Sequence, residues 1–305
     1  MPSLKEVRNR ISSTIGTQQI TSAMKMVSAS KLRRAQDAII AMRPFSEKLD
    51  EILENLLDSG VSSVGDFGKP RPAGKVTLIV LTSNRGLCGG FNSSVIKSAV
   101  QLLNTRYSEQ AKKGNVNLIC IGKKGADFFR KSNARNLSAH NHLWDKLTYA
   151  GAAEIMEGVI KDYAAGETDK VEIIYNQFKN AATQILSTEQ ILPFENAPAK
   201  NEAKQGKAKA SAALGPSSKS DYIFEPGKEE IIREIIPYSL KVRLFRSLLD
   251  SFAAEHGARM TAMHKATDNA QELLRNLRLT YNKARQAAIT KEILEIVGGA
   301  EAIKN

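Results

Sequence analysis

Two long helical patterns of coiled-coil type, one at each end of the chain, constrain this fold more than any other feature. Near the C-terminus, apolar and small residues alternate at steps of three and four, which is the seam of a coiled coil. These residues are Met263, Ala266, Ala270, Leu273, Leu277, Thr280, Ala284 and Ala287. Leu249, Phe252 and His256 continue the phase upstream. A helix over most of the stretch after Pro237 would be about 90 Å long.

The N-terminal end carries a matching pattern, which predicts a second long helix over residues 1–60. Its apolar positions are Leu4, Val7, Ile11, Ile15, Ile20, Met24, Val27, Met42, Phe45, Leu49, Ile52 and Leu56. Its internal breakers are Gly16 and Pro44. A proline in a helix interior costs about 3 kcal/mol, so we expect a bend near Pro44, with an end of the helix there as the stronger alternative. The second terminal helix is predicted over 228–303. Because the globular part of the chain lies between the two helices in sequence, both helices must extend from it.

The composition sets broad limits on what the chain can be. With 305 residues, 42% hydrophobic and 25% charged, it can hold one or two domains with a real core. The charged start shows neither a transmembrane run nor a secretory or transit peptide, and we expect the chain to remain outside the bilayer. Its two cysteines, Cys88 and Cys120, lack metal-ligand spacing and imply no disulfide framework, so we interpret them as buried thiols.

The net charge of +12 is concentrated in the two helical ends. Residues 1–43 carry eight basic and two acidic side chains, and residues 259–291 carry seven basic and two acidic ones. The charge on these helices is nearly all positive, and their seam residues are small. Both features indicate a slender rod that acts on an acidic partner, rather than a surface that only contacts solvent. Nucleic-acid binding by this basic coiled coil is one alternative, which would require a steep salt dependence of DNA affinity.

Between the helical ends, strand and helix patterns alternate. β-branched runs predict strands over 76–82, 116–121, 171–178 and 184–192, and helices are predicted over 93–107, 123–131 and 148–164. Thr148 is the expected N-cap of the last of these helices. This alternation predicts a central Rossmann-like α/β domain over 74–194 with a mostly parallel sheet. The Lys/Ala-rich residues 195–220 contain few large apolar side chains, and we interpret them as a flexible insertion.

A glycine-rich loop follows the first strand, over residues 83–92 (SNRGLCGGFN). Backbone amides at such a place can hold a phosphate, but the spacing differs from G-x-G-x-x-G and no Gly-Lys-Ser/Thr follows. A nucleotide-dependent enzyme with its ligand at residues 86–90 is the second alternative. The favoured interpretation is a tight turn, with Asn92 or Ser93 capping the next helix.

The remaining polar residues assemble no catalytic constellation. His140 and His142 form a His-x-His pair without a carboxylate or cysteine partner, which is weak evidence for a metal. We therefore expect no catalytic, cofactor or metal residues and predict a mechanical or binding role.

Several segments together resemble the gamma subunit of F-type ATP synthase. At the N-terminus these are residues 4–11 (LKEVRNRI), 19–27 (QITSAMKMV) and 29–33 (ASKLR), and in the middle residues 85–92 (RGLCGGFN). The strongest match lies at the C-terminus, in residues 255–260 (EHGARM), 266–270 (ATDNA), 281–286 (YNKARQ) and 289–292 (ITKE), followed by Glu295 and 298–300. The resemblance spans almost the whole chain.

The resemblance implies a central rotor stalk. In that family the terminal helices form a long antiparallel coiled coil inside a ring of alpha and beta subunits. The α/β domain sits at its foot with the epsilon subunit, on the c-subunit ring. One copy per complex would couple c-ring rotation, driven by proton flow, to ATP synthesis or hydrolysis in the beta subunits. The chain itself would be non-catalytic, with no cofactor and no nucleic acid, peripheral to a bacterial inner membrane on its cytoplasmic side.

The resemblance also implies which residues make contacts. Arg285, Gln286, Thr290 and Glu292 match positions that meet a loop of the beta subunit. Met24 and Lys25 match the facing part of the N-terminal helix. The tip around Ile293, Ile296 and Val297 would turn in an apolar sleeve, and Tyr222 and Phe224 would neighbour the c ring. The chain lacks the close cysteine pair of thiol-regulated chloroplast members, so no redox control is expected.

Overall fold

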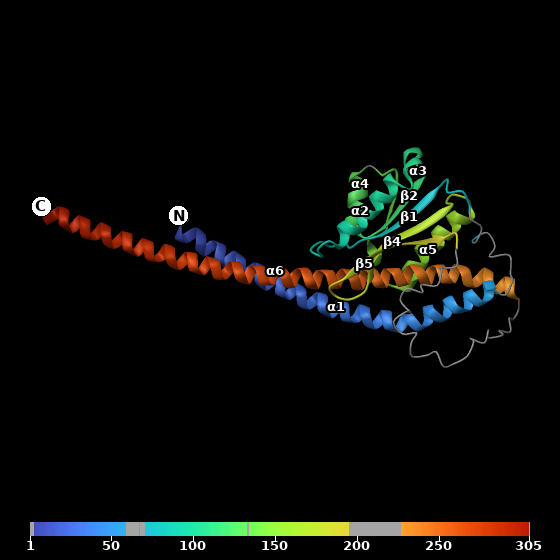
Figure 1. Ribbon diagram of the computed structural model, residues 1–305, viewed down its shortest axis with the longest axis horizontal. Helices are drawn as coiled ribbons and strands as arrows, with labels where there is room; N and C mark the ends of the chain where they lie inside the picture. Colours follow the sequence, from blue (N-terminus) through green and yellow to red (C-terminus); the bar gives the residue numbers. More distant parts are fainter. Residues whose placement is uncertain (1–2, 59–66, 68–70, 133, 195–226, 305) are drawn as a thin grey trace, which may run out of the picture.

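The computed structural model describes residues 3–58, 67, 71–132, 134–194 and 227–304. It consists of a long two-helix rod and a globular α/β domain that packs on one part of the rod (Figure 1). The rod is formed by α1, Leu4–Asp58, and α6, Lys228–Lys304. With 77 residues, α6 is about 115 Å long. None of the helices in these ranges combines the length and apolar character that a membrane span requires.

The two long helices run antiparallel, because contacts that rise along α1 fall along α6. Arg8 Nη2 donates to the Tyr281 hydroxyl at 3.0 Å, and the hydroxyls of Thr21 and Thr267 lie 2.9 Å apart. Farther along α1, Asp50 accepts from Arg243 Nη2 at 3.3 Å. The predicted long coiled coil of the N- and C-terminal helices is therefore confirmed.

The seam of α1 differs from the predicted one in its middle. Ile20 and Val27, expected inside, are 61% and 58% exposed, and Phe45 is 46% exposed. The residues that face α6 instead repeat at steps of four and three: Val7, Ile11, Thr14, Gln18, Thr21, Lys25, Ser28, Leu32, Ala35, Ile39, Met42, Ser46, Leu49 and Leu53. Small polar residues at this seam let the helices approach closely, and apolarity alone did not identify them.

Part of the predicted seam of α6 is displaced by one residue. Leu273 is 50% exposed, whereas Leu274 is 5% exposed. Thr280 and Ala287 are likewise exposed, and their successors Tyr281 and Ala288 are half-buried. Steps of three-four and four-three trace almost the same helical face, so the sequence pattern does not separate them. In the structure, contacts with α1, such as that of Tyr281 with Arg8, show that the seam follows the pattern displaced by one residue.

Both prolines in the long helices lie inside them. α1 continues through Pro44 to Asp58, so the alternative that the helix ends at Pro44 is wrong. Figure 1 shows α1 changing direction in its second half, consistent with the expected bend. Around the proline, Ser46 and Leu49 are buried against α6, and such packing offsets the lost hydrogen bond. Pro237 similarly lies in the first turns of α6.

The globular domain is built on one five-stranded sheet with the order β3-β2-β1-β4-β5. The strands are β1, Val76–Leu81; β2, Val116–Ile121; β3, Asn136–Ala139; β4, Lys170–Phe178; and β5, Gln184–Leu192. The pairs among β3, β2, β1 and β4 are parallel, and β5 is antiparallel to β4. The mostly parallel Rossmann-like sheet is confirmed. The edge strand β3 was missed because it is short and largely exposed.

Helices cover both faces of this sheet. They are α2, Phe91–Asn104; α3, Ser108–Lys113; α4, Lys123–Lys131; and α5, Tyr149–Ala164, with a 3-10 turn η2 at His142–Trp144. Thr148 caps α5 as expected, accepting from the Gly151 amide at 3.3 Å. The predicted helix 93–107 corresponds to α2, which ends earlier, at Asn104, and the short helix α3 that follows it at Ser108 was not predicted. The insertion predicted over 195–220 lies outside the described residues.

The sheet separates two cores, as the alternation of side chains along β1 shows. Val76, Leu78 and Val80 pack with α2 and α4 on one face. Ile79 and Leu81 pack on the other face with α5 and with α6. The α6 residues of this core are Ile232, Ile236, Leu240, Leu244 and Leu248. The first half of α6 is thus a core helix of the globular domain, and its second half is a helix of the rod.

Candidate functional site

The free end of α6 carries most of the predicted contact residues. Because the helices are antiparallel and α1 begins at Leu4 beside this region, α6 continues alone beyond the end of α1 (Figure 1). Arg285, Gln286, Thr290 and Glu292 are all exposed there. The Thr290 hydroxyl donates to the Gln286 carbonyl at 3.0 Å, within the same helix.

The same helical end exposes a continuous set of large apolar side chains. Their exposed fractions are 49% for Ile289, 54% for Ile293, 66% for Leu294, 71% for Ile296 and 54% for Val297. Exposed apolar residues in such a cluster mark a surface for interaction. The described residues of this chain thus leave these apolar side chains exposed.

Met24 and Lys25 lie elsewhere on the rod. Both are half-buried on α1, and Lys25 Nζ is 3.4 Å from His264 Nδ1 of α6. His264 in turn is 3.4 Å from the Asp268 carboxylate. His264 precedes Arg285 by about 20 residues, or about 30 Å of helix. The structure thus brings Arg285, Gln286, Thr290 and Glu292 together, separates them from Met24 and Lys25, and does not describe Tyr222 or Phe224.

The glycine-rich loop after β1 is a structural turn fixed by its own polar groups. The Asn92 side chain accepts from the Ser83 amide at 2.9 Å, and its Nδ2 donates to the Cys88 sulfur at 3.2 Å. Leu87 and Gly89 have positive φ angles of 61° and 59°. Burial raises the pKa of the Cys88 thiol. Asn92 therefore braces the loop from the first turn of α2, and the described geometry favours the tight turn over a phosphate cradle. The expected cap is wrong, because the N-cap of α2 is Gly90 and no side chain caps the helix.

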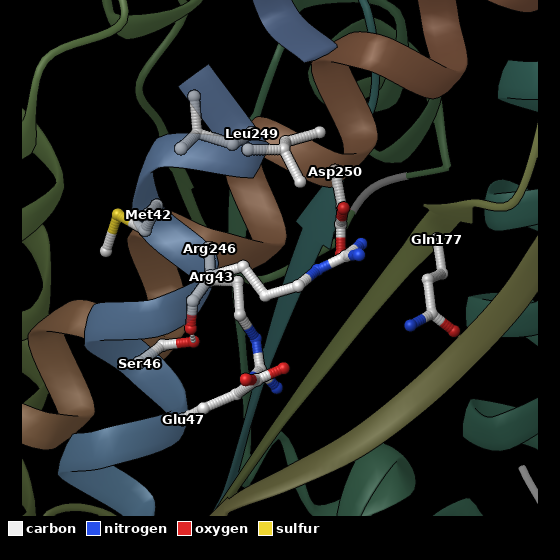
Figure 2. Close-up of a pocket in the computed structure, with 9 residues that line it drawn as sticks. Met42, Arg43, Ser46, Glu47, Gln177, Arg246, Leu249 and Asp250 are labelled. Atoms are coloured by element: carbon white, nitrogen blue, oxygen red, sulfur yellow. Dashed lines mark hydrogen bonds between the residues drawn. The ribbon is translucent and has the colours of Figure 1, made fainter. Parts of the chain in front are cut away.

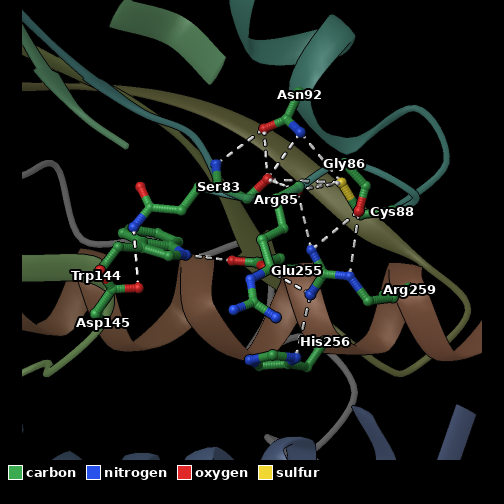
Figure 3. Close-up of polar contacts among 11 residues, drawn as sticks. Ser83, Arg85, Gly86, Cys88, Asn92, Trp144, Asp145, Glu255, His256 and Arg259 are labelled. Carbon is green, nitrogen blue, oxygen red and sulfur yellow. Dashed lines mark hydrogen bonds and ion pairs between the residues drawn. The ribbon is translucent and has the colours of Figure 1, made fainter. Parts of the chain in front are cut away.

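A buried ion pair of α6 lies directly against this loop (Figure 3). Glu255 and Arg259 are 4% and 6% exposed, and Arg259 Nη1 is 2.6 Å from Glu255 Oε1. Arg259 also donates to the carbonyls of Arg85 at 3.1 Å and Gly86 at 3.4 Å. On the other side, the Trp144 indole donates to Glu255 Oε2. We call Glu255, Arg259, Trp144 and the carbonyls of Arg85 and Gly86 the junction network.

The electrostatics of the junction network follow from its burial. Burial raises the pKa of Glu255, and the neighbouring Arg259 guanidinium opposes that shift. Burial lowers the pKa of His256 to about 3, and the charges of Arg259 and Lys31 add to the effect. A neutral His256 can accept from Arg259 Nη1, which lies 3.4 Å from its Nδ1. The network therefore holds one buried cation against one buried carboxyl group.

Sequence reasoning missed the junction network. The signal was a glutamate and an arginine four residues apart inside an otherwise small and apolar stretch, Phe252 to Met260. Such an i,i+4 pair within a buried helix must find partners inside the fold. His256, which continues the phase of the predicted seam, is 5% exposed, and its ring centroid lies 4.5 Å from that of Phe252.

A cavity of about 230 Å³ with several charged lining residues lies between α1, α6 and β4 (Figure 2). Its charged lining residues are Arg43 and Glu47 from α1, and Arg246 and Asp250 from α6. Two positive and two negative side chains give the cavity no net preference for an anion or a cation. Arg246 is also 3.6 Å from Asp50, so it already has an acidic partner.

His140 and His142 line a second cavity of about 260 Å³ beside α5. Their ring centroids are 6.2 Å apart, and burial together with the charge of His142 lowers the pKa of His140. Among the described residues, no group of three or more His, Cys, Asp or Glu side chains could hold a metal ion.

Comparison with known proteins gives one consistent family. A family model described as ATP synthase matches residues 3–303. The ATP synthase gamma chain of Flavobacterium johnsoniae is 55% identical over 304 residues, with 99% of both chains covered. That of Cytophaga hutchinsonii is 51% identical over 308 residues, with 100% of both chains covered.

Solved structures give the same fold. A chain from the central stalk and c ring of the Tetrahymena thermophila mitochondrial ATP synthase is 25% identical, with a TM-score of 0.59; the match covers 81% of this chain and 99% of that chain. A chain from the Euglena gracilis mitochondrial ATP synthase is 20% identical, with a TM-score of 0.66, and the match covers 98% and 94%. The second likeness concerns the fold alone.

Proposed function

Since this chain belongs to the ATP synthase family as a gamma chain, we propose that its two-helix rod turns as the central shaft of that complex. The globular domain, here called the foot, receives the torque, and the rod carries it to the catalytic subunits. The observation that carries the proposal is the single helical end of α6, which projects past α1 with an uncovered apolar tip. A shaft that turns inside a ring needs such an end.

The proposed partners are the alpha and beta subunits around the rod, and the epsilon subunit and c ring at the foot. In this arrangement one copy of the chain is peripheral to a bacterial inner membrane, on its cytoplasmic side. The beta subunits perform ATP synthesis and hydrolysis, and the gamma chain contributes no catalytic residue. Proton flow turns the c ring and the foot together, and the changing face of the rod moves each beta subunit through its nucleotide-binding states.

The proposed contacts divide according to their exposure. Arg285, Gln286, Thr290 and Glu292 are exposed and available to a loop of the beta subunit, while the tip at Ile293 and Val297 turns in an apolar sleeve. Lys25 already contacts His264 of α6, and Met24 is half-buried beside it, so both contribute through the shape of the rod as well as through direct contact. Exposed ion pairs contribute about 0–1 kcal/mol each, so the torque is distributed over many contacts.

The test is purification of the tagged chain from its native membranes, followed by mass spectrometry and an ATPase assay. We expect alpha, beta and epsilon subunits and ATPase activity in the eluate. An inactive eluate that contains nucleic acid would favour the basic rod as a nucleic-acid binder. An inactive eluate that contains the chain alone, with ATP or NAD binding by calorimetry, would favour a nucleotide-dependent enzyme.

A further inference from the structure

The middle of α6, at residues 255–261, fills the place where open α/β sheets bind their ligands. In such sheets that place is the crevice at the carboxyl ends of the strands, where the strand order changes direction, here between β1 and β4. The loop after β1 meets Arg259, and the turn after β4 meets Gly257 and Thr261. The Thr261 hydroxyl donates to the Ala181 carbonyl at 3.1 Å, and a Cβ at Gly257 would lie 3.2 Å from the same oxygen. In this chain, residues of α6 occupy the crevice and connect the helix to the loops after β1 and β4. We call this connection the joint.

We propose that Glu255 is the positioning residue that locks the foot onto the shaft at this joint. Its carboxylate accepts from the Trp144 indole, which belongs to η2 of the foot. Its other oxygen holds Arg259, whose guanidinium reaches the carbonyls of Arg85 and Gly86. One buried carboxylate of the shaft thus fixes two separate loops of the foot. This inference rests on the proposed rotor function and names residues that would transmit its torque.

The joint complements the apolar core at the other end of the foot. There, Leu240 and Leu244 of α6 pack among α5 and the sheet, and such apolar contacts have no preferred direction. The core continues along α6 to Leu248, which lies seven residues before Glu255, or about 10 Å along the helix. Hydrogen bonds at this second point are directional. Apolar packing supplemented by directional hydrogen bonds resists rotation of the foot about the shaft better than apolar packing alone.

The experiment compares two variants in the intact ATP synthase complex: Glu255→Gln, which removes the charge, and Trp144→Phe, which removes the indole donor and keeps an aromatic ring. Each loses a hydrogen bond to a charged group, which weakens the joint by about tenfold or more. We expect ATP hydrolysis in the presence of an uncoupler to stay near that of the unaltered complex. Protons pumped per ATP hydrolysed should fall about twofold or more as the opposing gradient grows, because the joint yields under load.

Glu157→Gln is the matched control. Glu157 of α5 accepts from Lys241 Nζ of α6 at 2.5 Å, so it also links the foot to the shaft, but its side chain is 51% exposed. We expect pumping per ATP to remain unchanged in this variant, since exposed ion pairs contribute little. A fall as large as that in Glu255→Gln would contradict the special role of the buried joint.

The outcomes separate this inference from the proposed function. If the unaltered chain assembles and pumps, and Trp144→Phe pumps as well per ATP under load as the unaltered complex, the joint does not transmit torque and the inference is wrong. This holds even if Glu255→Gln fails to assemble, because Trp144→Phe then decides alone. If the unaltered chain does not enter an ATPase at all, the proposed function fails first. Trp144 is the sole tryptophan, so its fluorescence in the isolated full-length chain shows directly whether Glu255→Gln alters its surroundings.

Discussion

The foot end and the free end of α6 belong to one continuous helix but are stabilised in opposite ways. At the foot, Leu240, Leu244 and Leu248 are fully buried, and the charged Glu255 and Arg259 have partners inside the chain. At the free end, Ile293 and Leu294 are more than half exposed. The foot end is therefore stabilised by its own chain, whereas the free end has an apolar surface that only a partner can cover. Buried core side chains and exposed apolar side chains therefore occupy different ends of the same helix.

The largest expected effect is on function, from removal of the free end. Deletion of residues 290–305 should abolish assembly or coupling, because it removes Thr290, Glu292 and the apolar tip. ATP-driven proton pumping in membranes measures this loss. The isolated truncated chain should keep its melting temperature within about 2 °C, because the side chains of residues 290–300, the part of the deleted segment whose burial the structure describes, are exposed. Normal pumping by the truncated chain would show that the free end is dispensable.

Truncation of one large apolar side chain at each end of α6 compares how much the two ends contribute to the free energy of unfolding. Leu248→Ala at the foot should lower the free energy of unfolding by about 2–5 kcal/mol, because Leu248 is fully buried. Ile293→Ala at the tip should change it by less than about 0.5 kcal/mol, because the side chain already meets solvent. Urea denaturation of the isolated chains measures both. Equal losses would mean that the tip is folded onto its own chain.

The pH dependence of stability sharpens the contrast between buried and exposed sites. The pKa of His256 is lowered to about 3 in the folded chain, against about 6.5 when it is unfolded. The unfolded state therefore binds the proton first, and the free energy of unfolding should fall by about 2 kcal/mol from about pH 7.5 to about pH 5. His256→Gln should remove this part of the fall in urea denaturation, and His264→Gln, at an exposed site on the same helix, should retain it. The same slope in all three chains would contradict the burial argument.

The smallest effects should come from single basic residues on the rod surface. Lys265 and Arg275 are exposed, so Lys265→Ala or Arg275→Ala should leave ATP hydrolysis within about twofold of normal. A steady-state ATPase assay of the assembled complex measures this. A large loss from either change alone would contradict distributed contact along the rod.

The elements of the fold could largely be predicted because their patterns are periodic. The strands 116–121 and 184–192 and the helix 123–131 begin and end in the structure where the sequence places them. The seam of the rod was less predictable, since Thr21 and Ser28 face α6 while the apolar Ile20 and Val27 face solvent. Local hydrophobicity cannot distinguish a seam residue from a residue that a partner covers.

The candidate site, like the fold, could be predicted from the sequence only in part. The tip at Ile293 and Val297 was predicted from family resemblance; its side chains are exposed in this chain, and the apolar sleeve remains a prediction. The junction network could not be predicted, because it joins Trp144 to Glu255 across 111 positions of sequence. Only the topology of the sheet brings η2, the loop after β1 and α6 to one place.

The most direct test of the shaft is observation of its rotation. Lys112→Cys offers an exposed thiol on the foot for a bead, while Cys88 and Cys120 are buried. With the alpha and beta subunits fixed to a surface, ATP should drive stepwise rotation of the bead in one direction. ATP hydrolysis at a normal rate with a stationary bead would contradict the assignment of this chain as the rotor.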